Sequence, residues 1–418
     1  MKYSSQRGTR DILPEDMPIW HALEKTCTRL FEIYNYHEIR TPIFESTELF
    51  TRSIGQDTDI VAKEMYTFVD KGERSITLRP EATAPVVRAA IQNNIISKDK
   101  LAKLYYVGPM FRYERPQAGR YRQFYQAGVE VFGSNDPSLD AEVILLATQI
   151  MKKLGIQNVE VDINSVGCKN CRPKYLDKIK SYFSTHKAEM CENCQERAER
   201  NVLRVLDCKE KNCQAYIEKA PSIADSLCPE CSGHFDSLKN ILSDLQVEYK
   251  INKRLVRGLD YYTKTTFEVV SKQLGAQNAI CGGGRYDNLV AEFGGDDIPA
   301  IGFAFGLDRL VEILKSHIPD LKFRERKLIY VATIDENSRK FGIDLLMKLR
   351  KMGTMADIDY LGRSLKSQMK EADRLKAKYV LVVGADELKS GKIVLRNMEK
   401  ATQEEIEIEK VFERIGLL

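Results

Sequence analysis

Residues 104–133 read LYYVGPMFRYERPQAGRYRQFYQAGVEVFG, and this stretch decides the fold of the larger part of the chain. An aromatic-rich run ends at Arg112, and a second, alternating run occupies residues 124–132. Because side chains on a strand alternate between two faces, Gln126 and Glu130 point to the same side as Gly128. The pattern predicts two antiparallel strands joined by a loop, with polar groups where a core would have apolar ones.

The loop between these two strands is rich in arginine. Guanidinium groups donate paired hydrogen bonds to phosphate oxygens, so the cluster suits a polyphosphate. Charged hairpins are also common at protein surfaces, so a solvated hairpin with a basic tip is the alternative interpretation. The stretch alone leaves both interpretations open. The arginines concerned are Arg112, Arg115, Arg120 and Arg122.

The segments around this hairpin extend the sheet. Residues 254–270 (RLVRGLDYYTKTTFEVV) predict a pair of strands, residues 281–290 (CGGGRYDNLV) a glycine turn, and residues 302–314 (GFAFGLDRLVEIL) a strand that runs into a helix. Consecutive strands joined by short turns favour an antiparallel sheet over a doubly wound parallel one. The predicted fold class is therefore α+β, with helices flanking a mostly antiparallel sheet.

A break in composition at residues 323–326 (FRER) separates a second domain. LIYVATI at 328–334 and YVLVVGA at 379–385 predict strands that alternate with helices. Such alternation is typical of an α/β domain with a largely parallel sheet. We therefore expect one domain over residues 1–325 and a second over residues 326–418.

Composition narrows the class of protein. The chain has 418 residues, of which 43% are hydrophobic and 30% charged, and its formal net charge is +4. These values are typical of a soluble globular protein of more than one domain. No apolar run is long enough to span a membrane, and the N-terminal MKYSSQRGTRDILPED has no apolar signal core. We expect a cytoplasmic protein without a membrane partner.

Eight of the ten cysteines fall in one segment, which we place as an insertion over residues 165–240. Paired cysteines at this spacing match tetrahedral zinc–thiolate sites, and cytosolic thiols stay reduced. They predict a structural zinc with two four-cysteine sites, or one site with the other pairs free. The alternative is a helical insertion whose cysteines are small buried hydrophobic residues. The candidate ligands are Cys168, Cys171, Cys191, Cys194, Cys208, Cys213, Cys228 and Cys231.

Four segments of the first domain place unusual polar residues on predicted strands or at helix starts. Buried charges are costly unless they are paired, so each needs an opposite charge or a ligand. Internal salt bridges between carboxylates and arginines are one explanation, but they leave the neighbouring glycines unexplained. Glycine permits close approach of a ligand to the backbone. The residues are Glu81, Thr83, Arg112, Gln126, Glu130, Arg257, Asp260, Tyr261, Tyr262 and Arg309.

These residues carry a resemblance to class II aminoacyl-tRNA synthetases of the histidyl-tRNA synthetase type. Residues 111–133 resemble the second class II signature, 302–310 (GFAFGLDRL) the third, and 36–50 (YHEIRTPIFESTELF) the first, which forms the dimer. RGLDYY at 257–262 and GGGRYDNLV at 282–290 resemble the two histidine-specific segments. RGTRDILPED at 7–16 and TLRPEATAPVVRA at 77–89 also match. The likeness covers essentially the whole chain.

The resemblance implies a homodimeric histidine–tRNA ligase. It would activate L-histidine with ATP and Mg²⁺ to histidyl-adenylate and transfer the histidyl group to tRNA(His). Its catalytic domain would occupy residues 1–325, interrupted by the cysteine-rich insertion, and residues 326–418 would bind the anticodon. One alternative is a histidine-binding regulatory subunit of ATP phosphoribosyltransferase, a non-enzymatic relative. Another is a zinc-knuckle RNA-binding protein without catalysis.

The resemblance also assigns roles by residue. It places Arg112 at the α-phosphate and carboxylate, Arg309 at the terminal phosphate, and Arg257 as a further cation at the α-phosphate. Arg120 and Arg122, on the tip of the hairpin, are candidates for ATP or the tRNA acceptor end. In the histidine pocket, neighbouring strand positions face opposite ways, so we expect one of Tyr261 and Tyr262 to point outward. The implied pocket residues are Glu81, Ala82 (glycine in many relatives), Thr83, Gln126, Glu130, Tyr261 and Tyr262.

Overall fold

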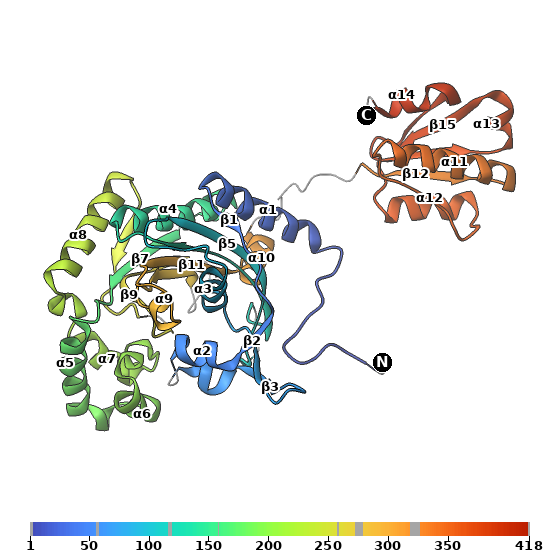
Figure 1. The fold of residues 1–418 in the computed structure, drawn as a ribbon. Helices are drawn as coiled ribbons and strands as arrows, with labels where there is room; N and C mark the ends of the chain where they lie inside the picture. Colours follow the sequence, from blue (N-terminus) through green and yellow to red (C-terminus); the bar gives the residue numbers. More distant parts are fainter. Residues whose placement is uncertain are drawn as a thin grey trace. The chain divides into compact units, whose positions relative to one another are not determined.

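The computed structural model describes residues 3–55, 58–115, 119–157, 159–256, 259–271, 279–317 and 327–416. The chain divides into two compact units, Met1–Leu321 and Lys322–Leu418 (Figure 1). Each unit has hydrophobic clusters of its own. Within the described ranges, every helix is too short or too polar to cross a membrane.

An eight-stranded sheet forms the centre of the first unit, in the order β1-β5-β6-β11-β10-β9-β7-β8. The inner pairs are all antiparallel, whereas β1 and β8 join the two edges in parallel. The predicted mostly antiparallel sheet flanked by helices is therefore confirmed. The strands are β1 (His37–Glu38), β5 (Ala102–Phe111), β6 (Gln123–Phe132), β7 (Val159–Ser165), β8 (Tyr249–Ile251), β9 (Thr263–Ser271), β10 (Ala279–Arg285) and β11 (Ala300–Gly306).

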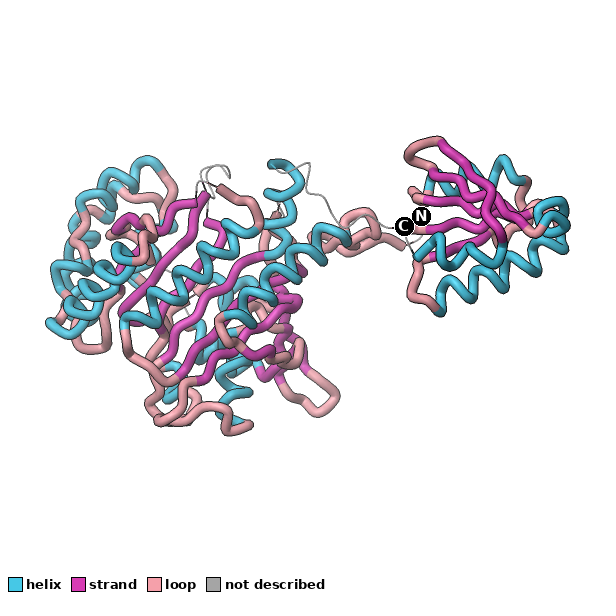
Figure 2. Tube along the Cα trace, turned by 90° about the horizontal axis from the view of Figure 1, so that it is seen from above, coloured by secondary structure: helices cyan, strands magenta, loops and turns pink. Residues whose placement is uncertain are grey.

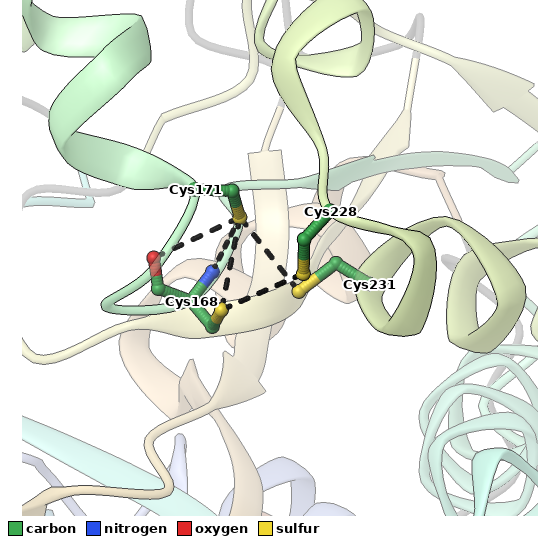
Figure 3. A group of neighbouring side chains, drawn as sticks. All are labelled: Cys168, Cys171, Cys228 and Cys231. Carbon is green, nitrogen blue, oxygen red and sulfur yellow. Dashed lines mark hydrogen bonds between the residues drawn. The ribbon is translucent and has the colours of Figure 1, made fainter.

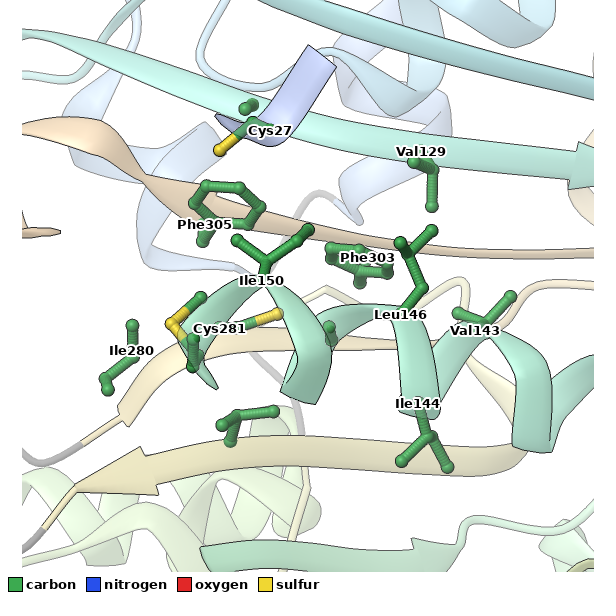
Figure 4. Packing of buried hydrophobic residues seen from close by; sticks show 14 of the residues in the cluster. Cys27, Val129, Val143, Ile144, Leu146, Ile150, Ile280, Cys281, Phe303 and Phe305 are labelled. Atoms are coloured by element: carbon green, nitrogen blue, oxygen red, sulfur yellow. The ribbon is translucent and has the colours of Figure 1, made fainter. Parts of the chain in front are cut away.

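One face of this sheet is covered by α1 (Met17–Ile33), α4 (Pro137–Lys153) and α10 (Leu307–His317), whose apolar side chains form the main core with the strands. In Figure 4, Leu146 and Ile150 of α4 lie against Phe303 and Phe305 of β11. Asp136 begins α4 because its side chain accepts the backbone N–H of Ser138. Since strand side chains alternate, the residues between these apolar positions face the opposite side.

The opposite side of the sheet carries α3 (Thr83–Gln92) and α9 (Leu289–Glu292), which contact each other. A small antiparallel sheet in the order β2-β4-β3 lies with α2 (Thr47–Ile54) in the same unit. Its strands are β2 (Phe44–Ser46), β3 (Tyr66–Val69) and β4 (Ser75–Leu78). Figure 2 shows strands side by side with helices packed along them.

The cysteine-rich insertion leaves the sheet after β7 and returns at β8. It is helical and consists of α5 (Arg172–Thr185), α6 (Glu192–Arg200), α7 (Lys211–Lys219) and α8 (Pro229–Asp244), drawn in green to yellow-green in Figure 1. Its apolar residues, among them Ile179, Phe183 and Ile217, belong to the same hydrophobic cluster as Val86 of α3. The insertion is thus continuous with the core of the first unit.

The second unit is an α/β fold with a five-stranded sheet in the order β13-β12-β14-β15-β16. Strands β13, β12 and β14 are parallel, as the alternating pattern predicts, whereas β15 and β16 add an antiparallel edge that the sequence did not reveal. The strands are β12 (Ile329–Thr333), β13 (Ala356–Ile358), β14 (Tyr379–Val383), β15 (Lys392–Asn397) and β16 (Thr402–Glu407). The helices are α11 (Glu336–Lys351), α12 (Leu365–Arg374), α13 (Ala385–Ser390) and α14 (Val411–Gly416).

Two local predictions were wrong. The glycine run 282–284 lies in the middle of β10 and is not a turn, since β10 pairs with both β9 and β11 there. Glycine is required because a Cβ at Gly283 would lie 2.2 Å from the carbonyl oxygen of Gly302. In the segment 254–270, the structure describes one strand, β9, preceded by turns at residues 259–261, in place of a pair.

Candidate active site

A polar floor lies on the face of the large sheet away from α4. On β6, Gln126 pairs with Gly306 of β11, and Glu130 pairs with Gly302. The partners are glycines, so no side chain from β11 covers the two polar groups. A Cβ at Gly302 would lie only 2.0 Å from Oε2 of Glu130, so the carboxylate needs the space that glycine leaves. Gln126 and Gly306 line a cavity on this face, whereas the carboxylate of Glu130 occupies the space that Gly302 leaves.

Glu130 is held by two hydroxyl groups. Oγ1 of Thr83 donates to Oε1 of Glu130 at 2.7 Å, and the hydroxyl of Tyr286 donates to Oε2. Only 1% of the Glu130 surface is exposed. This burial raises the pKa of Glu130 from 4.5 to about 8, although the two hydrogen bonds lower it in part. Burial therefore favours the protonated form of Glu130 more than in an exposed glutamate.

Glu81 lies at the start of α3. Its carboxylate accepts the backbone N–H groups of Thr83 at 2.6 Å and Ala84 at 3.0 Å, which satisfies two free donors of the first helical turn. Burial raises the pKa of Glu81. Ala82 is buried between these residues. Among the described residues, Glu81 and Glu130 thus receive hydrogen bonds from backbone and hydroxyl groups in place of the arginine salt bridges considered from sequence.

The two neighbouring tyrosines do not face opposite ways as expected. Tyr261 and Tyr262 are both buried, and their ring centroids lie 4.8 Å apart. They lie at the end of the turn before β9, so the alternation of a strand does not apply to them. Tyr261 also contacts Tyr286, with ring centroids 5.6 Å apart. The backbone carbonyl of Tyr262 accepts a hydrogen bond from Arg172 of the insertion.

Arginines line a cavity of about 220 Å³ beside this polar floor. Arg112, Arg120 and Arg309 all contribute to its wall, together with Gln126. Nε of Arg112 donates to the carbonyl of Pro80 at 2.8 Å, which holds the guanidinium beside the start of α3. Burial lowers the pKa of Arg309, and the nearby charge of Arg120 lowers it further. Because these two positive guanidinium groups lie near each other, each destabilises the charged form of the other. A bound anion would stabilise both charges.

The arginine hairpin is fixed against α10. The N–H of Gly119 donates to Oε1 of Glu312 at 3.0 Å, and the hydroxyl of Tyr121 donates to the same oxygen at 3.2 Å. Arg122 stacks on the ring of Tyr113 at 3.7 Å, so its side chain is occupied locally. Arg120 is exposed, lines the cavity and donates to Oε2 of Glu114 at 3.4 Å. The described residues of the hairpin loop are thus held by specific contacts within the first unit.

Two further residues predicted to be functional, Arg257 and Asp260, come shortly before β9 in the sequence. Arg257 lies outside the described residues. Asp260 lies in the described turn, where it accepts hydrogen bonds from Nδ2 of Asn201 at 3.2 and 3.4 Å. Tyr286, by contrast, is a site residue that the sequence did not single out. The sequence feature that could have identified Tyr286 is its position directly after the glycines and Arg285 in GGGRYDNLV.

The cysteines of the insertion fall into two groups of four. Cys168, Cys171, Cys228 and Cys231 form the outer cluster, and Cys191, Cys194, Cys208 and Cys213 form the inner cluster. Within each cluster all sulfur atoms lie within 4.8 Å of one another, so each group could hold a metal ion. Figure 3 shows the sulfur atoms of the outer cluster converging from two separate segments. Cys27 and Cys281 are buried elsewhere, in the main core.

Comparison with protein families covers both units. Residues 8–310 match the family described as histidyl-tRNA synthetase, and residues 328–416 match the family described as anticodon binding domain. The histidine–tRNA ligase of Halothermothrix orenii is 51% identical to the chain over 418 residues, which is 100% of both chains. That of Desulforamulus reducens is 50% identical over 405 residues, which is 97% of both.

Solved structures that are similar to the chain include histidyl-tRNA synthetases. The apo histidyl-tRNA synthetase of S. aureus matches with a TM-score of 0.83 and 39% identity, covering 99% of each chain. An ATP phosphoribosyltransferase regulatory subunit/histidyl-tRNA synthetase from Bacillus halodurans C matches with a TM-score of 0.63 and 21% identity, covering 92% of this chain and 99% of that one. The second likeness shows a shared fold alone.

Proposed function

The chain belongs to the histidyl-tRNA synthetase family, and on this basis we propose that it is a histidine–tRNA ligase that forms histidyl-adenylate from L-histidine and ATP and charges tRNA(His). Full-length relatives of that name are about half identical to it. For the alternative, a histidine-binding regulatory subunit of ATP phosphoribosyltransferase, there is only a likeness of fold to a structure that is 21% identical. The enzyme is therefore an AMP-forming aminoacyl-tRNA ligase.

The observation that carries this proposal is an acceptor left without a partner in the polar floor. Oε1 of Gln126 is buried and has no hydrogen-bond partner within the described part of the chain. A buried polar atom without a partner is costly, so it points to a missing donor. The α-ammonium group of an amino acid supplies such a donor, and the cavity that Gln126 lines continues to the arginines.

In the proposed complex, the histidine ammonium binds Gln126, Glu81 and Thr83, with Ala82 forming part of the wall. The imidazole ring lies at Glu130, with Tyr261 and Tyr262 beside it. A pocket that hydrogen-bonds both ring nitrogens rejects apolar amino acids, because its own polar groups would lose their partners.

The arginines would bind ATP and stabilise the charge that develops in the reaction. An oxygen of the histidine carboxylate attacks the α-phosphorus, the bond from that phosphorus to the bridging oxygen breaks, and pyrophosphate leaves. Fixed cations near the reacting phosphate lower the barrier because they need no reorganisation. We assign Arg112 and Arg257 to the α-phosphate and Arg309 to the terminal phosphate, with Arg120 at ATP or the tRNA end.

Magnesium would accompany the nucleotide and neutralise its phosphates. In the second step, a terminal ribose hydroxyl of tRNA attacks the histidyl carbonyl and AMP leaves.

Further features fit the same proposal. Residues 1–325 would be the catalytic domain, with the insertion at residues 165–240, and residues 326–418 would bind the anticodon. Exposed apolar side chains on and beside the small sheet suit a homodimer interface in a cytoplasmic enzyme. We also propose that the insertion holds structural zinc. The exposed apolar residues are Ile43, Phe44, Phe68 and Val69.

Histidine-dependent exchange of pyrophosphate into ATP tests the proposal. Gln126→Met keeps the side-chain volume but removes the acceptor, so the KM for histidine should rise by about tenfold or more, as for a lost hydrogen bond to a charged group. Gln123→Met, on the same strand but exposed, is the matched control and should leave KM unchanged. Folded protein without histidine-dependent exchange would contradict the assignment.

A further inference from the structure

The two cysteine clusters are nested along the chain. Both pairs of the inner cluster lie between the two pairs of the outer cluster, whose halves are 60 residues apart. A tetrahedron with metal–sulfur bonds of about 2.3 Å has sulfur–sulfur edges of about 3.8 Å. In the outer cluster, the Cys168–Cys171, Cys168–Cys228 and Cys171–Cys231 sulfur distances are each 3.8 Å. In the inner cluster, the Cys191–Cys208 sulfur distance is also 3.8 Å. The sulfur geometry therefore suits one tetrahedral ion per cluster.

The backbone around the sulfur atoms suits thiolates. N–H groups donate to the sulfur of Cys171 at 3.1 Å and of Cys213 at 3.2 Å, and to those of Cys168 and Cys208 at 3.4 Å each. Such hydrogen bonds stabilise a metal-bound thiolate and orient it. Each pair also has at least one cysteine at the N-cap or in the first turn of a helix, namely Cys171 at α5, Cys191 at α6, Cys213 in α7 and Cys228 at α8. The positive end of a helix favours a thiolate further.

The outer cluster is joined directly to the histidine pocket. Arg172, which follows Cys171, donates to the carbonyls of Val166 at 3.3 Å and of Tyr262. Lys264 exchanges two backbone hydrogen bonds with this segment, receiving one from Val166 at 2.7 Å and giving one to Gly167 at 2.9 Å. Gly167 has φ +68°, and a Cβ there would lie 2.7 Å from the sulfur of Cys171. The first cysteine pair and the pocket loop thus form one hydrogen-bonded unit.

Two further contacts connect the insertion to residues 259–264. One comes from beside Cys228 and Cys231 of the outer cluster, and the other from the segment of the inner cluster. Glu230, between Cys228 and Cys231, pairs with Nζ of Lys264 at 3.0 Å. Asn201, in the inner cluster's segment, donates to Asp260 at 3.2 Å. A cavity of about 310 Å³ separates the insertion from the loop and is lined by Arg172, Asn201, Asp260 and Tyr262. Tyr261 and Tyr262 also belong to the same hydrophobic cluster as Val166 and Val202 of the insertion, so the loop is held by apolar packing as well as by these polar contacts.

We infer that the insertion binds two zinc ions, one in each cluster, and that the outer ion fixes residues 259–264 through Arg172, so that metal loading sets the affinity for histidine. This inference deepens the proposed function and rests on it only for the role of the loop. Arg172 is a positioning residue in this scheme, since it contacts the Tyr262 backbone. A d¹⁰ ion with four thiolates has no open coordination position, so neither ion takes part in the chemistry.

Metal analysis of the purified full-length protein tests the stoichiometry. We expect two zinc ions per chain, one after Cys228→Ser with Cys231→Ser, one after Cys191→Ser with Cys194→Ser, and two in the control Cys27→Ala. Titration of the metal-free wild type with Co²⁺ provides the test if a double variant does not fold. Its thiolate charge-transfer band should saturate at two equivalents. Fewer than two bound ions in folded wild type, or iron in place of zinc, would overturn the inference.

Calorimetric titration with histidine tests the link to the pocket and needs no catalysis. Arg172→Ala should keep both zinc ions but weaken histidine binding by about fivefold, the effect of one lost hydrogen bond, with ATP affinity unchanged. Lys174→Ala, exposed on the same helix, is the control and should bind histidine like wild type. Unchanged histidine affinity in Arg172→Ala would refute the link. Failure of pyrophosphate exchange with both results intact would instead reject the ligase proposal alone.

Discussion

At the scale of single residues, Glu130 illustrates how the surroundings of a carboxyl set its charge. Its two oxygens accept hydroxyl hydrogen bonds from Thr83 and Tyr286, yet burial prevails and raises its pKa to about 8. In the complex that we propose, this carboxyl meets the imidazole ring of histidine, so we expect the affinity for histidine to depend on pH.

Replacement of Glu130 by Gln should change the pH dependence of stability. The folded pKa is raised above 4.5, so this term is fully stabilising below pH 4.5 and is lost as pH rises toward about 8. Wild type should therefore lose up to a few kcal/mol of unfolding free energy over that range through this group, and Glu130→Gln should not. Urea unfolding at a series of pH values measures the difference. Parallel pH profiles of the two proteins would show that Glu130 does not titrate as described.

At the scale of elements, a buried ion pair ties together α4, β10 and α8. Arg285 and Asp140 are both fully buried, with Nε of Arg285 donating to Oδ1 of Asp140 at 2.8 Å. His234 of α8 contacts Oδ2 of Asp140 at 2.8 Å. Burial alone would raise the pKa of Asp140, but Arg285 and His234 outweigh it and the pKa is lowered. The pair locks the end of the insertion onto the sheet that carries the site.

Removal of the Asp140 charge should lower the unfolding free energy by more than the intact Arg285–Asp140 ion pair contributes to it. Asp140→Asn leaves the buried Arg285 with only the more distant carboxylate of Asp287, whose Oδ1 lies 3.3 Å from Nη1. We therefore expect a loss of about 3 kcal/mol in unfolding free energy, the lower end of the range for a broken buried ion pair. Asp136→Asn, at the exposed N-cap of the same helix, is the comparison and should cost no more than about 1 kcal/mol, because asparagine also caps helices. Chemical denaturation of both variants measures these values. An equal, small effect would indicate that the buried pair is not intact.

At the scale of the whole molecule, the chain consists of two units with separate cores. The second unit packs Leu346 and Leu349 of α11 against Val331 and Leu381 of its own sheet. A unit with such a core does not depend on the other for its folding. Activation of histidine and recognition of tRNA can therefore be separated by cutting the chain between the units.

Truncation after residue 325 tests this separation. The shortened protein should retain histidine-dependent pyrophosphate exchange near the full-length rate, because every described site residue precedes the cut. Charging of tRNA(His) should fall strongly, because the anticodon-binding domain that we propose is missing. The two assays on one preparation form an internal control. Loss of exchange in a folded, truncated protein would show that the catalytic unit needs the second unit.

The antiparallel sheet, the α/β fold of the second unit and the family could all be predicted from the sequence. These follow from local periodicity and from long ordered motifs such as the arginine hairpin, which need no knowledge of distant contacts. Three features became visible only in the folded chain: which cysteines share a cluster, the strand at residues 282–284, and the burial of both Tyr261 and Tyr262. Each of these depends on contacts between segments far apart in the chain: the halves of the outer cluster are 60 residues apart, and Gly283 is glycine because of Gly302 on another strand. The pattern of residues within one segment does not predict these contacts, because it does not specify which distant segment packs against it.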